Sequence, residues 1–219
     1  MKVLVACEYS GIVRESFLKR GHDAMSCDLL PSEIPGNHYQ GDVLDIINQS
    51  WDMLIAFPPR TYLCSSGYHW NYKRPERMKK TEDAIVFFMK LINAPINKIC
   101  IENSIGIMST RYRKPDQIIQ PYEYGHPESK ATCLWLKNLP LLEPTKYAEF
   151  KTYRCCGNTF EEKFGKYGCP ICNGKKTAKP LWENMTKSGQ NKLTPSDNRS
   201  KIRSKTYQGI ADAMADQWG

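Results

Sequence analysis

The chain has 219 residues, with 31 Lys and Arg against 23 Asp and Glu, which gives a formal net charge of +8. This length predicts one domain with at most a small appendage, and a hydrophobic content of 41% excludes a chain that is disordered throughout. No apolar run approaches the ~20 residues of a membrane span, and no signal-peptide cleavage site follows the short run after Lys2. We therefore expect a cytoplasmic globular protein without a membrane partner.

The first half of the sequence alternates between strand and helix patterns. Strands are expected at Lys2–Cys7, Asp23–Cys27, Gly41–Val43, Trp51–Phe57 and Ile99–Ile101. Helices are expected at Ile12–Arg20, Leu44–Ile47 and Pro75–Ile92. This alternation predicts a parallel sheet covered by helices on both faces. Ligands of such sheets bind at the carboxyl ends of the strands.

The second half has a different composition. Short strands are expected at Ile118–Tyr122 and Thr132–Leu136, and a closing helix at Gly209–Trp218. Between them, Gly174–Lys205 is polar and basic and shows no hydrophobic period. We therefore expect this segment to be a loop, or to be ordered only with a partner.

The turn after the first strand is typical of nucleotide-binding folds, although it contains a single glycine, Gly11. Asp28 follows seventeen residues later, at the spacing at which a carboxylate reaches a ribose diol, and Asp42 could meet an adenine. Each aspartate could equally serve as a helix cap or a turn residue.

Two more strands end in unusual residues at the same expected edge. The fourth runs into Phe57-Pro58-Pro59-Arg60, where the double proline restricts the backbone. The fifth runs into Glu102-Asn103. Packing explains this polar pair poorly, although a capping role is possible.

Four of the nine cysteines are clustered, at Cys155, Cys156, Cys169 and Cys172. In a reducing compartment such a cluster favours a metal over disulfides, and the odd total argues against complete disulfide pairing. Cys169 and Cys172 have the spacing of a zinc knuckle, whereas the adjacent Cys155 and Cys156 are irregular. A site of three cysteines completed by His126 is one alternative, and free cysteines in a loop are another. We expect a structural zinc ion on which the loop depends for its fold.

Several stretches resemble the small phage-type DNA cytosine-5 methyltransferase homologues. They are Val3–Arg14, Arg20–Asp23, Cys27–Pro31, Gly41–Val43, Trp51–Pro59, Ile101–Asn103, Lys130–Pro140 and Ser204–Ala211. The resemblance leaves out the cysteine cluster and the basic loop, and it implies a Rossmann-like three-layer α/β/α sandwich of the S-adenosylmethionine-dependent type. The cysteine spacing adds a small zinc-binding insertion to this sandwich. We therefore expect a methyltransferase core at 1–146, a zinc-knuckle insertion and basic loop at 147–205, and a C-terminal helix packed on the core at 206–219. If a phage encodes the protein, it works in the host-cell cytoplasm.

The resemblance also assigns roles to residues. Glu8, Tyr9, Ser10 and Gly11 would hold the methionine end of S-adenosylmethionine, Asp28 its ribose and Asp42 its adenine, with Phe57 and Pro58 beside them. Glu102, with Asn103 next to it, would hold the target base at its ring nitrogen 3.

One position departs from the family. Its Pro-Pro-Cys nucleophile is Pro-Pro-Arg here, and the guanidinium of Arg60 stays protonated and only donates hydrogen bonds. Amino-group methyltransferases instead have Asp, Asn or Ser followed by Pro-Pro and an aromatic residue. That motif is also absent, because Phe57 stands at its first position and Arg60 at its last. Three interpretations remain open. In the first, Cys64 serves as a displaced nucleophile. In the second, the chain binds cofactor or DNA without catalysis, and Arg60 contacts a phosphate or a base edge; in the third, Arg60 is a clamp in a different reaction on a pyrimidine.

The expected partner is DNA, either a duplex with a flipped base or a single strand. The basic segment, with Trp182 and Tyr207 near it, fits phosphate-backbone binding, although a solvated lysine-rich loop has the same composition. A free nucleotide substrate also stays open. Four side chains could stack on a base or simply pack within their loop: Tyr62, Tyr68, His69 and Trp70.

Overall fold

The computed structural model describes residues 1–150, 152–156, 158–161, 169, 171–172, 179–186, 191–196 and 198–219. The chain forms two compact units. Unit 1 comprises residues 1–119, 131–143 and 205–219, and unit 2 comprises residues 120–130 and 144–204. None of the helices in the described ranges has the length and apolar character needed to span a bilayer.

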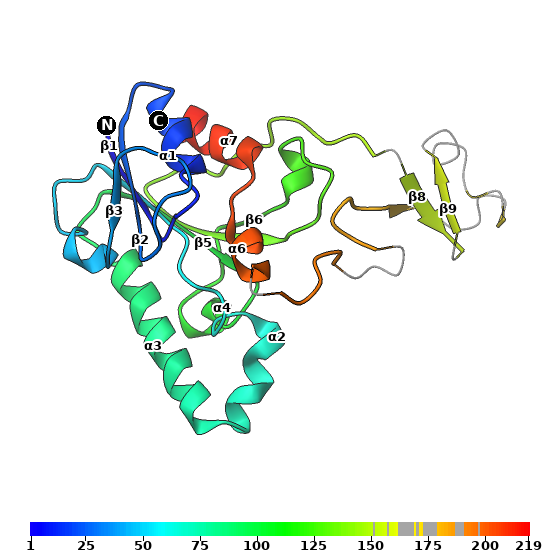
Figure 1. The fold of residues 1–219 in the computed structure, drawn as a ribbon, viewed down its shortest axis with the longest axis horizontal. Coiled ribbons are helices and arrows are strands. Elements are labelled where there is room, and N and C mark those ends of the chain that lie inside the picture. Colours follow the sequence, from blue (N-terminus) through cyan, green and yellow to red (C-terminus); the bar gives the residue numbers. More distant parts are fainter. Residues whose placement is uncertain are drawn as a thin grey trace. The chain divides into compact units, whose positions relative to one another are not determined.

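Unit 1 is built on a seven-stranded sheet with the strand order β3-β2-β1-β4-β5-β7-β6 (Figure 1). The strands are β1 (Lys2–Ala6), β2 (Asp23–Asp28), β3 (His38–Gln40), β4 (Met53–Ala56), β5 (Lys98–Ser104), β6 (Gln117–Ile119) and β7 (Thr132–Lys137). The helices are α1 (Ile12–Leu18), α2 (Ser65–Tyr68), α3 (Pro75–Ile92), α4 (Met108–Arg111) and α7 (Gln208–Trp218), with 3-10 helices η1 (Val43–Asp45) and η2 (His69–Tyr72).

The first five strands run parallel, which confirms the sheet expected for the first half of the chain. Strand β7 then runs antiparallel to both β5 and β6. The described residues between β6 and β7 contain a single 3-10 turn, η3 (Pro121–Glu123), and no crossover helix of the kind that a parallel connection needs. This order, with one antiparallel strand inserted next to the edge, is typical of S-adenosylmethionine-dependent methyltransferases, so the predicted fold class is confirmed.

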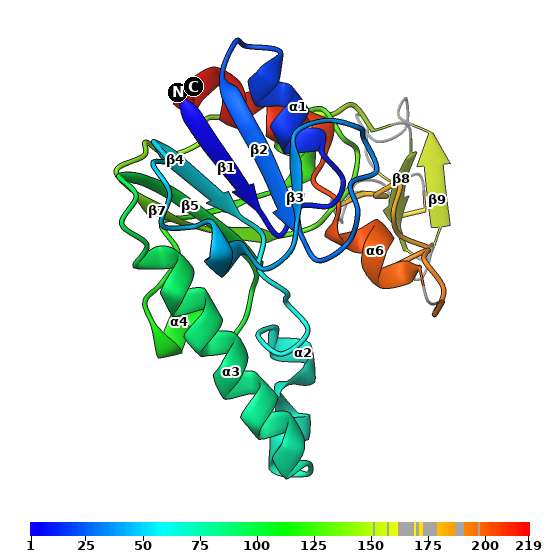
Figure 2. The same ribbon diagram turned by 60° about the vertical axis from the view of Figure 1, so that its left-hand side comes forward.

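Both faces of the sheet are buried, because its strands are apolar at successive positions. On one face Leu4, Leu54 and Ile99 join the hydrophobic core that includes Phe88 and Leu91 of α3. The alternate residues, such as Val5 and Ile55, are equally buried and point to the opposite face. Figures 1 and 2 show α1 and α7 together on one side of the sheet and α3 on the other. These are the three layers.

The predicted boundaries of α3 are confirmed, whereas the predicted third strand is wrong. The strand is His38–Gln40, which pairs with Ser26–Asp28 of β2. The expected range, Gly41–Val43, instead leads into η1, because the side chain of Asp42 accepts the N–H of Leu44 and caps a 3-10 turn. The predicted first helix ends two residues earlier, at Leu18.

Unit 2 contains η3, the strands β8 (Thr152–Cys155), β9 (Asn158–Glu161) and β10 (Lys179–Pro180), and the helix α6 (Arg199–Ser204). The three strands form a small antiparallel sheet in the order β10-β8-β9. Helix α6 and β10 correct the expectation that Gly174–Lys205 is a loop throughout. Lys175, Lys176 and Lys187 of the expected basic segment lie outside the described residues. Within unit 2 the ring centre of Trp182 lies 4.9 Å from that of Tyr122, on which it stacks, and 4.9 Å from that of Phe150, which it meets edge-to-face.

Candidate functional site

Two residues with left-handed backbone flank the turn that follows β1. Cys7 has a φ of 57° and Gly11 a φ of 77°. A non-glycine residue in this region carries strain on the order of 1–3 kcal/mol. At Gly11 a side chain has no room, because an added Cβ would lie 2.9 Å from Nη2 of Arg14. Burial and then the nearby carboxylate of Asp28 raise the pKa of the Cys7 thiol, as does Asp42. Acidic groups therefore gather at the carboxyl ends of the central strands.

The carboxylate of Glu8 occupies the N-terminus of α1. Its Oε1 accepts hydrogen bonds from the main-chain N–H of Val13 at 2.6 Å and from the hydroxyl of Ser10 at 3.2 Å. Its Oε2 accepts the N–H of Arg14 at 3.3 Å. The N-cap residue, Gly11, has no side chain with which to cap the helix. Glu8 supplies that missing cap and fixes the turn.

The titration of Glu8 should be visible in the stability of the protein. Burial raises the pKa of Glu8 from 4.5 to about 7, against the opposing effect of the N–H groups that it accepts. The folded state then binds more protons than the unfolded chain between about pH 4.5 and 7, so the unfolding free energy falls as pH rises through this window. The contribution is at most about 1.4 kcal/mol per pH unit. We expect Glu8→Gln to remove this fall in urea titrations, and identical pH slopes for both proteins would contradict the assignment.

Asp28 and Asp42 each use one carboxylate oxygen to cap the chain that follows. Asp28 Oδ1 accepts the N–H of Leu30 at 2.9 Å, and Asp42 Oδ1 accepts the N–H of Leu44 at 3.0 Å. Asp28 is half-buried at the end of β2, and burial raises the pKa of its carboxyl group, whereas Asp42 is exposed. Both aspartates therefore serve as caps, which was the alternative to a cofactor-binding role. The cap uses one oxygen of each carboxylate and leaves the other for a second role.

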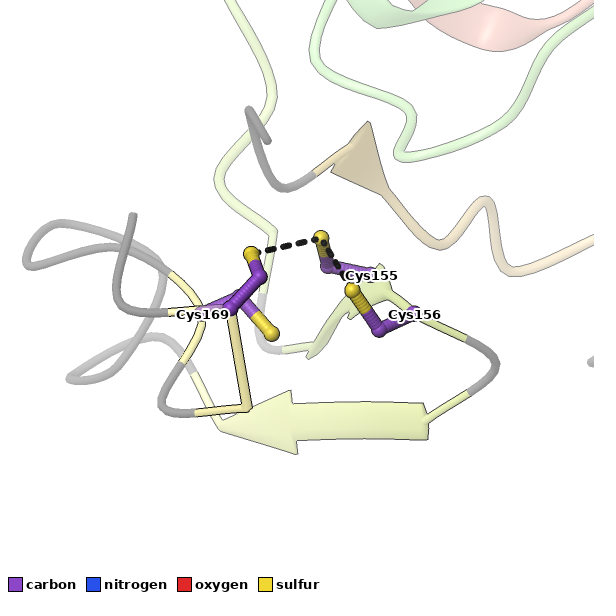
Figure 3. Close-up of side chains that lie close together, drawn as sticks. Cys155, Cys156 and Cys169 are labelled. Carbon is purple, nitrogen blue, oxygen red and sulfur yellow. Dashed lines mark hydrogen bonds between the residues drawn. The ribbon is translucent and has the colours of Figure 1, made fainter. Parts of the chain in front are cut away.

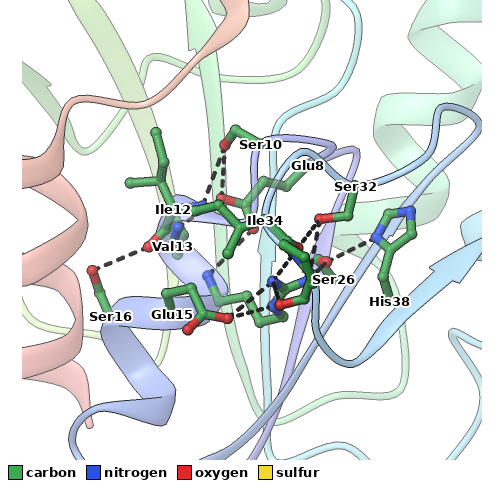
Figure 4. Close-up of polar contacts among 12 residues, drawn as sticks. Glu8, Ser10, Ile12, Val13, Glu15, Ser16, Ser26, Ser32, Ile34 and His38 are labelled. Carbon is green, nitrogen blue, oxygen red and sulfur yellow. Dashed lines mark hydrogen bonds and ion pairs between the residues drawn. The ribbon is translucent and has the colours of Figure 1, made fainter.

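Arg14 is a residue of this region to which the sequence analysis gave no role. Its side chain is fully buried, and its guanidinium reaches from α1 to β2 and the segment after it. Figure 4 shows its partners Ser26, Ser32 and Ile34 close to Glu15. It donates to the carbonyls of Ile34 and Pro35 and to hydroxyls on Ser26 and Ser32. Its Nη2 also lies 2.9 Å from the Glu15 carboxylate. The only sequence signal for this role of Arg14 is its place next to the apolar positions of a short helix.

The segment held by Arg14 adjoins the turn that contains Glu8. The carbonyl of the buried Tyr9 accepts the N–H of Glu33 at 2.8 Å. Ser26 in turn contacts Nδ1 of His38 at 2.8 Å. Arg14 and Tyr9 therefore position residues 31–36 beside the expected cofactor edge.

The ends of β4 and β5 are joined by a buried amide. Asn103, which is 2% exposed, donates from Nδ2 to the carbonyl of Pro58 at 2.9 Å. Its Oδ1 accepts the main-chain N–H of Ser104. Glu102 precedes it and is half-buried, as is Phe57 at the end of β4. Asn103 thus acts as a brace that fixes Pro58, which leaves Glu102 as the polar group of the pair nearest to solvent.

The chain after Pro59 folds back on itself. The carbonyl of Arg60 accepts the N–H groups of Leu63 and Cys64, both at 3.0 Å. One helical turn separates Arg60 from Cys64, about 6 Å along the axis, rather than the ~13 Å of four extended residues. The fold-back that a displaced nucleophile requires is therefore present.

Cys64 is also tied to the loop that follows β5. It bridges to Gly106, and the N–H of Ile107 donates to the carbonyl of Leu63 at 2.9 Å. Only glycine fits at 106, because an added Cβ would lie 2.0 Å from that carbonyl. The half-exposed thiol of Cys64 lies 3.4 Å from the hydroxyl of Ser66. Cys64 is therefore held against the loop that follows β5, the strand that carries Glu102.

In unit 2 the four clustered cysteines come together, and Figure 3 shows three of them, Cys155, Cys156 and Cys169. Their sulfurs lie within 4.8 Å of one another, and the group consists of Cys155, Cys156, Cys169 and Cys172. The sulfurs of Cys155 and Cys156 are 3.7 Å apart, and those of Cys155 and Cys172 are 3.9 Å apart. Four thiolates at ~2.3 Å from a tetrahedral zinc ion would be ~3.8 Å apart, so the cluster fits zinc. In the described part of the chain His126 is not a member of the group.

The backbone explains how adjacent cysteines can serve one ion. Cys156 has a φ of 51°, in the left-handed region. In an extended strand successive side chains point to opposite sides, whereas this bend after β8 turns both thiols toward the same centre. Burial and the neighbouring thiols raise the pKa of Cys155 to about 12.

Comparisons with known proteins give weak structural similarity. No protein-family model matches the chain, and no curated protein sequence matches it. A prophage-encoded protein of E. coli, described as a candidate DNA modification methyltransferase, aligns with a TM-score of 0.46 and 16% identity over 68% of this chain. A methyltransferase of Entamoeba histolytica aligns with a TM-score of 0.41 and 14% identity, also over 68%. This chain spans 52% and 57% of the length of those two structures.

Proposed function

We propose that the protein binds S-adenosylmethionine and acts on cytosine in DNA as a cytosine-5 methyltransferase-like protein. The proposal combines the fold with the acidic edge formed by Glu8, Asp28 and Asp42. In a sheet of this type ligands bind at the carboxyl ends of the strands, where these three residues lie.

The observation that carries the proposal is the carboxylate of Glu8 at the N-terminus of α1. In dinucleotide-binding folds this position receives the pyrophosphate. Here the N–H groups of Val13 and Arg14 are already taken by the buried carboxyl group of Glu8, so they are not available to a phosphate. S-adenosylmethionine has no phosphate and carries positive charge on its sulfonium and amino groups. The acidic edge therefore favours this cofactor over a nicotinamide or flavin dinucleotide.

Calorimetry tests the cofactor. We expect micromolar binding of S-adenosylmethionine and S-adenosylhomocysteine and no binding of NAD. In Asp28→Ala the affinity should fall by about 10- to 100-fold, because the ribose would lose charge-assisted hydrogen bonds. Asp23→Ala is the matched control, since Asp23 is an exposed aspartate at the other end of the same strand. No binding at millimolar cofactor, or equal affinity of both variants, would contradict the proposal.

For the base, we propose that Glu102 contacts ring nitrogen 3 of cytosine and that Cys64 supplies the nucleophile. The thiolate would add to carbon 6, carbon 5 would take the methyl group from the sulfonium, and loss of the carbon 5 proton would then release the thiolate. The turn from Arg60 to Cys64 and the bridge to Gly106 support this assignment, since they keep the thiol beside the β5 loop. Asn103 is assigned a positioning role through its hydrogen bond to Pro58.

A second candidate function is binding without catalysis, and Arg60 at the nucleophile position favours it. Methyl transfer to mixed-sequence DNA separates the two functions. If Cys64 is the nucleophile, wild type is active and Cys64→Ser loses activity by at least about 10²-fold, while cofactor affinity is unchanged. If the chain is a binder only, wild type is inactive, and a gain of activity in Arg60→Cys would show that only the nucleophile is missing.

We also propose that a zinc ion bound by Cys155, Cys156, Cys169 and Cys172 is structural. Four thiolates fill a tetrahedral site, so no position is left open for a substrate or an activated water. The described cluster supplies all four ligands from a hairpin and the segment that follows it. The ion would then stabilise unit 2 rather than take part in chemistry.

A further inference from the structure

Residues 60–80, here termed the α2–α3 arm, concentrate positive charge and aromatic side chains. They contain six basic residues and one acidic residue, a net +5 in 21 residues, against +8 for the whole chain. The basic residues are Arg60, Lys73, Arg74, Arg77, Lys79 and Lys80. The arm also carries His69 and four larger aromatic residues, Tyr62, Tyr68, Trp70 and Tyr72. A segment of this composition is suited to bind a polyanion that also has planar groups.

The arm extends away from the sheet. In Figures 1 and 2 the helices α2 and η2 and the first turns of α3 lie apart from the strands. Two of its aromatic side chains are open to solvent, since Tyr72 is 76% exposed and Trp70 is 41% exposed, whereas Tyr68 packs against the core. Lys73, Arg74, Lys79 and Lys80 are all exposed.

The arm is nevertheless held in a defined shape. The buried side chain of Asn71 and Thr81 exchange two hydrogen bonds, which fix η2 against α3. Arg77 donates to the carbonyls of Gly67 and Thr61, and its guanidinium stacks on Tyr62 at 4.9 Å. These contacts join the start of α3 to the part of the arm that carries Arg60 and Cys64. An ordered surface loses less entropy on binding than one that must first fold.

Charge and aromatic faces are combined within the arm. Nζ of Lys73 lies 5.4 Å from the ring centre of Trp70, and the guanidinium of Arg74 lies 5.0 Å from it. Tyr72 presents its ring to solvent while one edge contacts Tyr68. Proteins that bind unpaired nucleotides combine stacking rings with cations that follow the backbone. Paired bases in a duplex offer no free face for stacking.

We infer that the α2–α3 arm binds single-stranded nucleic acid, with bases stacked on Trp70 and Tyr72 and phosphates contacted by Lys73 and Arg74. The inference rests on the proposed function in that nucleic acid is the partner. It adds the position and the strandedness of the contact, and it requires neither methyl transfer nor bound cofactor.

Fluorescence anisotropy with a labelled 20-nucleotide single strand and its duplex tests the inference. We expect the single strand to bind more tightly than the duplex, and Trp70→Ala and Tyr72→Ala each to weaken it about 10-fold without changing the salt dependence. The double variant Lys73→Gln/Arg74→Gln should reduce the slope of log affinity against log salt by about 1.4. Tyr147→Ala, an exposed tyrosine outside the arm, and Lys90→Gln, at the far end of α3, are matched controls.

Each outcome has one meaning. Single-strand affinity equal to wild type in the aromatic variants, or a duplex preference in wild type, would overturn the inference. Cofactor calorimetry on the same proteins separates it from the proposed function, since the arm variants should bind S-adenosylmethionine normally. If wild type binds no cofactor but the arm variants still show the expected losses of single-strand affinity, the proposed function is rejected and the inference about the arm stands.

Discussion

Replacement of Arg14 by methionine is expected to lower the unfolding free energy by about 3 kcal/mol or more. The side chain is fully buried and makes six polar contacts with α1, β2 and residues 32–35. Methionine has a similar length and no donor, so the buried hydroxyl of Ser26 and the carbonyls of Ile34 and Pro35 would lose the donor that binds them. Urea denaturation monitored by circular dichroism measures the loss.

The same variant should lose cofactor affinity beyond its loss of stability, because residues 31–36 adjoin Asp28. We expect at least about 10-fold weaker binding at a temperature at which the variant is fully folded. Arg20→Met is the matched control. Arg20 is a partly exposed arginine that pairs with Asp212 and Asp216, and its loss should cost less than about 1 kcal/mol. Equal stabilities of the two variants would contradict the role given to Arg14.

Removal of zinc is expected to unfold the hairpin of unit 2. The described cluster places four sulfurs at the spacing of a tetrahedral site, and binding to such sites is worth about 10 kcal/mol or more. We expect one zinc ion per chain by elemental analysis and loss of it in Cys169→Ser. Proteolysis of residues 144–204 should then become rapid, while the sheet of unit 1 stays folded.

Cys64→Ser is the matched control for the zinc experiment, because Cys64 is a partly exposed cysteine outside the cluster. It should retain one zinc ion and the proteolysis pattern of wild type. Full zinc content in Cys169→Ser would exclude this residue as a ligand. Purified wild type without zinc, yet with unit 2 resistant to protease, would reject a structural metal.

The sequence by itself determined the class of fold. Apolar runs such as Val3–Ala6 and Met53–Ala56, separated by a helical pattern, allow only buried parallel strands with helices on both faces. The 18-residue helix α3 was predicted with its correct ends, since Pro75 marks its start and its apolar residues follow a helical period. The cysteine cluster was predicted from spacing, because local sequence limits which thiols can meet.

Only the tertiary structure decided how the site is assembled. The third strand was misplaced because pairing with β2 selects His38–Gln40, and a three-residue strand carries too few residues for a readable period. The burial of Arg14 depends on four acceptors that lie 12 to 21 residues away, and no local pattern reports such contacts. The same holds for Cys64, whose position depends on Gly106 from another loop. Periodicity records which face of an element is buried, whereas contacts between distant segments arise only when those elements pack.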